Sequence, residues 1–390
     1  MCRMFSSKKL KGYYLYNFLI SAVNTGSGNF TMVYFYLHGM PIMAVLGAMF
    51  TYSLTCLVIL KPVGILIEKI GPQKTFYLSA ITGALKYFAI LSIFIFPEHK
   101  LVFFLLWQFF NGFNVMLSRI PLNSYFSAYG DNDKRGSQIG LVNNIQILAS
   151  AIVPILAGVL IEKTGIIIIT TITTIVSIAA IFVLKFDDDV KIKDPVHFKS
   201  LFKKFPKPFT KAFFFDCLAN PFTADLLSIY IAITLNSFTV LGIFIGLRTA
   251  VNIFLNYFVG HMTDKNSVKI IFIVSIFVSS IFYFVIPFVH IPSTLFLLQF
   301  TLGLAGLIIS IPFESAYHNV AKKSDSPIQF ALWREVAKQT GLVIGSGLTM
   351  LILYFGVVSN WQMLLPLGAI SAFAMFFILP QISNGKQPAR

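Results

Sequence analysis

Charged residues are scarce in this sequence. Asp, Glu, Lys and Arg together make up 12% of the 390 residues, about half of the share found in soluble domains. Hydrophobic residues make up 56%, and apolar runs of about 20 residues, each long enough to cross a bilayer as a helix, recur along the chain. The runs are continuous, whereas the strands of a membrane barrel alternate apolar and polar residues. The composition therefore predicts an all-α polytopic membrane protein.

The residue patterns of catalytic, metal and nucleotide sites are also missing. The chain has 3 cysteines and 6 histidines, and neither set has the spacing of a metal site. It contains no glycine-rich phosphate-binding loop, so nothing in it resembles the motor of an ATP-driven transporter. We therefore expect no enzyme activity, no cofactor and no metal ion.

The net charge of +15 could indicate a nucleic-acid partner, but the distribution of the charge favours a membrane. If the N-terminus is cytoplasmic, most lysines and arginines outside the apolar runs fall on the cytoplasmic side, and the outer turns hold little beyond Lys100 and Lys163. This asymmetry is the positive-inside rule. It predicts a multi-pass protein of the cell (inner) membrane with both termini in the cytoplasm. The expected spans are residues 12–36, 41–67, 74–96, 100–127, 136–161, 165–185, 211–235, 238–262, 268–289, 293–318, 328–354 and 360–380.

Two segments repeat between the halves of the chain. The first is a short charged turn between apolar runs, and its copies begin at Gly64 and Gly260, an offset of 260 − 64 = 196. The second matches residues 106–124 to residues 297–315 without a gap, at an offset of 297 − 106 = 191. Internal duplication in a membrane chain is typical of transporters, in which two halves move about a central site. We expect two pseudo-symmetric six-helix bundles, residues 1–185 and 211–390, joined by a cytoplasmic linker at 186–210.

The linker has an amphipathic pattern. Phe198, Leu201, Phe202 and Phe205 lie at helical spacings, with lysines between them. Such a pattern predicts a short basic helix on the inner leaflet. A solvated linker without fixed shape is the alternative.

With these motifs the chain resembles a transporter of the major facilitator superfamily over nearly all of its length. The family pattern between helices two and three is Gly-x-Leu-Ala-Asp-Arg-x-Gly-Arg-Lys. The matching residues here are Gly64, Glu68, Lys69 and Gly71, and those of the second copy are Gly260, Asp264 and Lys265. The resemblance implies that these residues form a conformational gate, in which the acid stabilises the outward-open state by pairing across to the other half.

The sequence also departs from the family pattern. Glu68 replaces the usual aspartate and Pro72 replaces a basic residue, so we expect a weaker charge relay. The glycine-rich fifth-helix signature of proton-linked drug antiporters is reduced to Pro154 and Gly158. Drug efflux is therefore less favoured, and the direction of transport stays open.

Polar residues within the spans are candidates for the solute or ion pathway, because a charge in a membrane is costly and usually faces the bundle interior. The candidates are Asn24, Gln108, Arg119, Asp216, Asp225, Arg248, Glu314, Arg334 and Glu335. Lys86 is a further charge, near the middle of the third span. For each residue the competing interpretation is a structural ion pair between helices.

Helical spacing predicts which of these candidates share a face of their helix. Asn17, Ser21, Asn24 and Gly28 are spaced by four, three and four residues, which places them on one face of an ideal first helix. Asp216 and Asp225 are nine residues apart, which places them on opposite faces of an ideal helix. Both can face one cavity only if Pro221 bends the helix.

The carboxylates and one arginine suggest specific roles. A desolvated carboxylate such as Asp225 is suited to carry a proton. Arg248 requires a counter-charge, for which Asp225 and Glu335 are the candidates.

We therefore expect a secondary transporter, a monomer among membrane lipids, that moves a small polar or charged solute by alternating access. Coupling to a proton or sodium gradient is expected. Two alternatives remain open. One is proton-driven efflux of amphipathic compounds, and the other is a non-transporting membrane receptor with the same fold.

Overall fold

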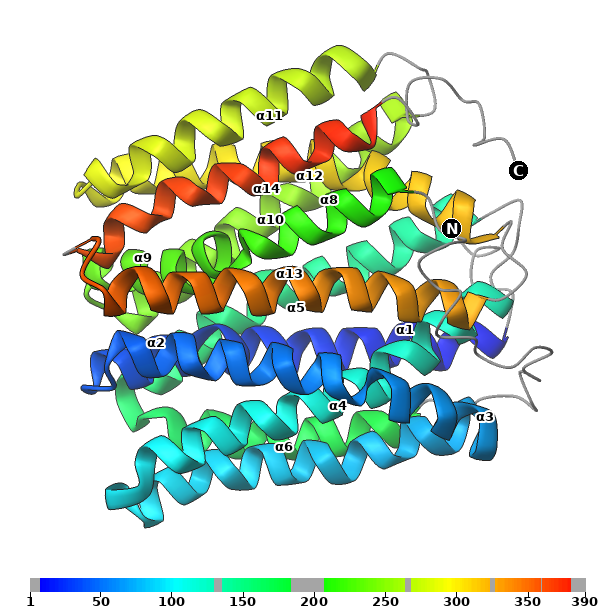
Figure 1. Ribbon diagram of the computed structural model, residues 1–390, viewed down its shortest axis with the longest axis horizontal. Helices are drawn as coiled ribbons and strands as arrows, with labels where there is room; N and C mark the ends of the chain where they lie inside the picture. Colours follow the sequence, from blue (N-terminus) through cyan, green and yellow to red (C-terminus); the bar gives the residue numbers. More distant parts are fainter. Residues whose placement is uncertain are drawn as a thin grey trace.

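The computed structural model describes residues 8–129, 135–183, 207–263, 268–322, 327–358 and 360–379. Within these ranges the chain is nearly all helical and contains no strand. The helices run side by side in a single bundle with their turns at the two ends (Figure 1). The predicted all-α fold is confirmed.

The first half of the chain supplies six passes across the bundle. The opening pass is α1 (Lys8–Val23), the π-helix η1 (Asn24–Gly28) and α2 (Asn29–Leu37), and the others are α3 (Ile42–Ile95), α4 (Lys100–Tyr129), α5 (Arg135–Thr164) and α6 (Ile166–Val183). A short 3-10 turn, η2 (Pro97–His99), joins α3 to α4.

The second half follows the same plan. Its opening pass is α8 (Lys207–Leu218), the π-helix η4 (Pro221–Leu226) and α9 (Leu227–Leu235), and the others are α10 (Phe238–Thr263), α11 (Val268–Val285) ending in η5 (Ile286–Phe288), α12 (Pro292–Lys322), α13 (Pro327–Tyr354) and the closing run of η6 (Trp361–Gly368), α14 (Ala369–Ala374) and η7 (Met375–Phe377). These bounds agree with the expected spans, except that α8 begins at Lys207, inside the segment expected to be linker.

Length and composition agree with a membrane protein. In the described ranges, 8 helical segments are long and apolar enough to cross a membrane, and one of them is the 54-residue α3. The expected amphipathic helix around Phe202 lies outside the described residues.

The helix α3 is two passes joined by a very tight turn. Gly71 has φ 84° and ψ 162°, which is not helical, and only glycine adopts such a positive φ without strain. The hydroxyl of Thr75 donates a hydrogen bond to the carbonyl of Gly71 at 2.8 Å. The charged segment that begins at Gly64 therefore does reverse the chain in very few residues.

We name the two ends of the bundle by their turns. The basal end is where α1 begins and where α3 turns at Gly71. The apical end holds the turns at Gly39, Gly165 and Asn236, all with positive φ. The basal end is on the right in Figure 1 and the apical end on the left.

The opening passes of the two halves are interrupted by π-helices at equivalent positions. The first residue of η1 is Asn24 and that of η4 is Pro221, an offset of 221 − 24 = 197. A π-helix accommodates one extra residue in a turn and often occurs at functional sites. The break therefore occurs at the same depth in both halves.

A close helix contact is also made twice. In α4, a Cβ on Gly112 would lie 3.0 Å from the backbone oxygen of Tyr52 in α3. In α12, a Cβ on Gly303 would lie 3.3 Å from Cγ of Arg248 in α10. The offsets, 303 − 112 = 191 and 248 − 52 = 196, are those of the sequence repeat. The contacts agree with a pseudo-symmetric pair of bundles.

A third pair of contacts uses different chemistry in the two halves. Between α1 and α5, the amide of Gln146 donates to Asn17 at 2.8 Å, and the hydroxyls of Ser21 and Ser150 lie 3.1 Å apart. Between α8 and α13, the matching contact is made by glycine, because a Cβ on Gly345 would overlap the carbonyl of Leu218. Small residues allow this close backbone packing within a membrane.

The glycine contact between α8 and α13 can be tested by stability. Gly345→Ala should lower the free energy of unfolding by about 1–3 kcal/mol, since an added methyl group forces the two helices apart. Gly306→Ala is the matched control, because a Cβ at Gly306 in α12 meets nothing within 4 Å. Thermal unfolding in detergent gives the comparison. Equal melting temperatures for the two variants would contradict the packing argument.

Candidate functional site

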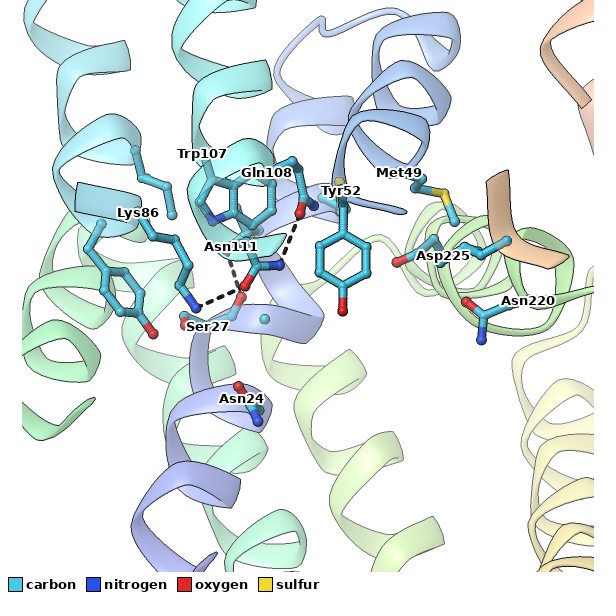
Figure 2. Close-up of a pocket in the computed structure, with 16 residues that line it drawn as sticks. Asn24, Ser27, Met49, Tyr52, Lys86, Trp107, Gln108, Asn111, Asn220 and Asp225 are labelled. Carbon is cyan, nitrogen blue, oxygen red and sulfur yellow. Dashed lines mark hydrogen bonds between the residues drawn. The ribbon is translucent and has the colours of Figure 1, made fainter. Parts of the chain in front are cut away.

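A polar cavity of about 230 Å³ lies at the level of the two π-helices (Figure 2). Its wall is built from both halves of the chain. The lining residues are Asn24, Ser27, Gly28, Thr31, Met32, Met49, Tyr52, Lys86, Tyr87, Ile90, Trp107, Gln108, Asn111, Asn220, Asp225 and Leu342. The last three come from the second half.

One wall of the cavity holds an ammonium group in a fixed position. Lys86 Nζ, on α3, donates to Asn111 Oδ1 at 3.2 Å, and Asn111 Nδ2 donates to Gln108 Oε1 at 3.0 Å. The ammonium also lies 4.6 Å from the centre of the Tyr87 ring, a distance at which the ring face attracts a cation. Lys86 is only 9% exposed. This chain of contacts orients the amine at the edge of the cavity.

The other wall holds a carboxylate. Asp225 lies in η4, and within the described residues its side chain makes no hydrogen bond or ion pair. Figure 2 shows Asp225 and Lys86 at opposite sides of the cavity, with Tyr52 between them. An unpaired carboxylate in a low-dielectric interior is costly. The cavity therefore presents an acceptor that favours a cation.

Two ion pairs lie toward the basal end. Arg119 of α4 pairs with Glu335 of α13 at 3.5 Å, which links the two halves, and Glu335 is only 1% exposed. Gln339 donates to the same carboxylate oxygen at 3.3 Å. Arg334 pairs with Glu314 of α12 at 2.7 Å, within the second half. These are partnered charges, as expected of structural ion pairs.

The structure divides the predicted pathway residues into two groups. Asn24, Gln108 and Asp225 line the cavity, and the remaining six do not. Those six are Arg119, Asp216, Arg248, Glu314, Arg334 and Glu335. The carboxylate of Asp216 accepts a hydrogen bond from Ser371 at 2.6 Å, and Asp216 is not among the residues that line the cavity. The π-helix η4 begins at Pro221, between Asp216 and Asp225, so the spacing of an ideal helix does not apply to this pair.

The prediction that Asp225 or Glu335 neutralises Arg248 is wrong. Its guanidinium donates to the amide oxygen of Gln299 at 3.1 Å, while Glu335 pairs with Arg119 and Asp225 has no partner within the described ranges. Arg248 packs against Gly303 of α12, and Gln299 lies one turn away on the same helix. A neutral amide therefore takes the place of the carboxylate.

Several cavity residues are missing from the predicted set of pathway residues. Lys86 is visible in the sequence as a lone amine in mid-span, which is the signal that marks it. Asn111 and Asn220 carry no such signal. Their roles become recognisable only in the structure, where α4 and the residue directly before η4 lie beside the cavity.

The residues of the expected gate motif are only partly described. Gly64 is buried and Gly71 makes the turn, while Glu68 and Lys69 are exposed at the basal end. Gly260 lies near the end of α10. Asp264 and Lys265 lie outside the described residues. The gating role of the motif stays a prediction.

The apical ends of the two halves are packed together. Glu162 of α5 accepts hydrogen bonds from the hydroxyl of Ser237 at 2.8 Å and from the backbone N–H of Thr239 at 2.7 Å. Both donors lie at the start of α10, where backbone N–H groups lack helical partners. Just below, Gly158 and Gly242 bring the two backbones into contact. This apical latch joins the halves without a covalent link.

Apolar clusters also contribute to the contact between the two halves. One large cluster crosses between the halves and includes Phe30 and Tyr230. Among the described basal residues, one cluster around Phe76 belongs to the first half and another around Trp333 to the second. A smaller cluster of α3, α4 and α13 crosses there beside the Arg119 ion pair. Among the described side chains, the largest cluster that crosses between the halves extends toward the apical end.

Comparison with known proteins identifies the class. The profile of the Major Facilitator Superfamily matches residues 13–233. That range is more than half of the chain, so this protein belongs to the superfamily, whose members are membrane transporters.

A solved structure shows how far the fold extends. The chain resembles a variant of the E. coli fucose:proton symporter FucP with TM-score 0.66 and 10% sequence identity, over 97% of this chain and 99% of the symporter. The likeness establishes the fold over essentially the whole length. No curated protein matches the sequence significantly.

The apical latch can be tested by accessibility. Glu162→Gln should weaken the contact, because charge-assisted hydrogen bonds are about twice as strong as neutral ones. Val33 is fully buried in the large apolar cluster that crosses between the halves. A cysteine introduced there should then react faster with a thiol reagent. Glu98→Gln, in the exposed apical turn η2, is the control. Equal rates in both variants would contradict a latch.

Asp225 and Asp216 both lie in the opening pass of the second half. Replacing each by asparagine should change the stability of the protein in opposite directions. Asp225→Asn should raise the melting temperature of the ligand-free protein, because an uncompensated carboxylate is replaced by a neutral group. Asp216→Asn should lower the free energy of unfolding by about 1 kcal/mol, because Ser371 loses a charged acceptor. Thermal unfolding in detergent without added solute measures both. A destabilised Asp225→Asn variant would show that the carboxylate has a partner.

Proposed function

We propose that this protein is a secondary active transporter that moves a small polar or charged solute across the cytoplasmic membrane by alternating access. The observation that carries the proposal is the polar cavity between the halves. It lies beneath an apical contact made of hydrogen bonds and glycine packing. Contacts of this kind can open and close, and a midplane site between two bundles is suited to such a cycle.

The orientation is inferred from the distribution of charge. Lysines near the basal end include Lys8, Lys69, Lys74 and Lys207, and basic residues favour the cytoplasmic side. We therefore assign the basal end and both termini to the cytoplasm. The apical latch then faces the exterior.

Cation coupling is supported by the carboxylates. Asp216, Glu314 and Glu335 each have a partner, whereas Asp225 has none in the described ranges. Glu314 pairs with Arg334 and is thus a weaker candidate than Asp225 to carry a proton. Protonation of Asp225, or a positively charged group of the solute bound there, would offset the cost of its burial. Transport driven by an ion gradient fits this site.

The two alternative functions have less support. A receptor of the same fold would be expected to have every intramembrane charge paired locally, which does not describe Asp225. Efflux of amphipathic compounds would favour a predominantly apolar cavity, whereas this lining combines apolar side chains with amide, hydroxyl and charged groups. The proposed protein is a monomer in contact with lipid, and small solutes are its expected partners.

Filling the cavity should stop transport without unfolding the protein. Gly28 lines the cavity, and a Cβ there meets nothing within 4 Å, so Gly28→Phe places a ring in open space. A panel of solutes is first screened by thermal shift, since a ligand that binds the folded state raises its stability. Solutes that bind are then tested for uptake into proteoliposomes.

The control for the filled cavity adds the same ring elsewhere. Ile175 is 63% exposed on α6, so Ile175→Phe should leave binding and uptake unchanged. We expect Gly28→Phe to lose both the thermal shift and the uptake while keeping a cooperative unfolding transition. Normal uptake by Gly28→Phe would show that solute does not pass through this cavity.

A further inference from the structure

The cavity carries one charge of each sign, and the two are not paired with each other. The ammonium of Lys86 donates to the amide oxygen of Asn111. The carboxylate of Asp225 has no hydrogen-bond or ion-pair partner in the part of the chain that the structure describes. They lie at opposite sides of the same space (Figure 2). Different elements, α3 and η4, hold them apart.

Both groups keep unused capacity toward the cavity. An ammonium group has three donors, and the hydrogen bond to Asn111 uses one of them. An ionised carboxylate is an acceptor only, and that of Asp225 accepts from no described residue. A ligand can therefore accept from Lys86 and donate to Asp225 at the same time.

Ligands with a single charge fit this arrangement poorly. A simple cation would neutralise Asp225 but would share the cavity with the Lys86 ammonium. A simple anion would pair with Lys86 but would face the carboxylate of Asp225. Like charges close together in a site of low dielectric are strongly unfavourable. A neutral solute would leave both protein charges without an ionic partner.

The remaining lining is partly polar and partly apolar, which suits a short chain between two charged ends. Amides and hydroxyls come from Asn24, Gln108 and Thr31, and the apolar surface comes from Met49 and Trp107. A cavity of about 230 Å³ limits the ligand to a small molecule.

From this geometry we propose that the transported solute is a small zwitterion of the amino-acid type. Its ammonium group binds Asp225, and its carboxylate binds Lys86. The proposal rests on the proposed transport function and specifies the chemical class of its solute. The two charges select the ligand jointly, so that each excludes the solutes that would suit the other alone.

The test uses a series in which the two charges are separated by one methylene more at each step. The probes are glycine, β-alanine, γ-aminobutyrate, 5-aminovalerate and 6-aminohexanoate. Each is added to the full-length protein in detergent, and the shift in melting temperature is measured. Butylamine and butyrate are the singly charged controls, and a set of sugars and polyols is the neutral control.

We expect one charge separation to stabilise the protein most, and the controls to give no shift at the same concentration. Asp225→Asn and Lys86→Met should each weaken binding of the best probe by about 30-fold or more, as expected when one partner of a buried charge pair is removed. Asp225→Glu extends the carboxylate by one methylene and should move the optimum to a shorter probe. That variant keeps the charge, so it tests the idea even if the neutral variants fold poorly.

The outcomes separate this inference from the transport function. If sugars or singly charged solutes bind as well as the zwitterions, and Gly28→Phe abolishes that binding, the zwitterion is wrong and the transport site stands. An optimum that does not move in Asp225→Glu would also overturn the assignment of the ammonium to Asp225. If no solute class binds the wild type, or if Gly28→Phe takes up the solutes that bind as well as the wild type does, the transport function assigned to this cavity fails.

Discussion

A charge inside a membrane-spanning bundle requires a partner, because hydrocarbon supplies none. The packing of this protein reflects how that requirement is met. Arg119 and Glu335 join α4 to α13, Arg334 and Glu314 join α13 to α12, and Arg248 bonds Gln299 across α10 and α12. Each partner of such a pair fixes the rotation of its helix. Among the carboxylates inside the described part of the bundle, Asp225 lacks such a partner, and it lines the cavity.

The two ends of the bundle are held by different chemistry. At the apical end, α5 and α10 touch through glycine and through Glu162 at the start of α10. Toward the basal end, the contact between halves includes an ion pair with one partner almost fully buried. Breaking a buried pair leaves a charge unsatisfied, whereas separating an exposed carboxylate from a helix end returns both to water. The hydrogen bonds of the apical contact should therefore break at lower cost than the basal ion pair.

Most of the fold could be predicted from the sequence because composition alone marks membrane spans. Apolar runs end where charge or glycine appears, and the turn at Gly71 lies at such a boundary. The repeat was visible because residues that make a helix contact, such as Gly112 and Gly303, recur with it. Side chains of the second gate copy, Asp264 and Lys265, lie outside the described residues, so their role stays a prediction.

The cavity was harder to predict, and the reason is local geometry. Ideal spacing places Asn17, Ser21, Asn24 and Gly28 on one face. In the structure the first two contact α5, while Asn24 and Gly28 line the cavity. The π-helix η1 starts between the two groups, and its wider turn changes the direction in which the later side chains point. No pattern of polar residues reports such a widening.

The matching π-helices also have a consequence for the history of the chain. A π-helix of this kind corresponds to one residue inserted into an α-helix. η1 and η4 begin 221 − 24 = 197 residues apart, close to the offsets of the sequence repeat. If both halves descend from one ancestral unit, a single insertion before the gene duplicated explains both. At the repeat offset, 220 − 24 = 196, Asn24 matches Asn220, and both residues line the cavity.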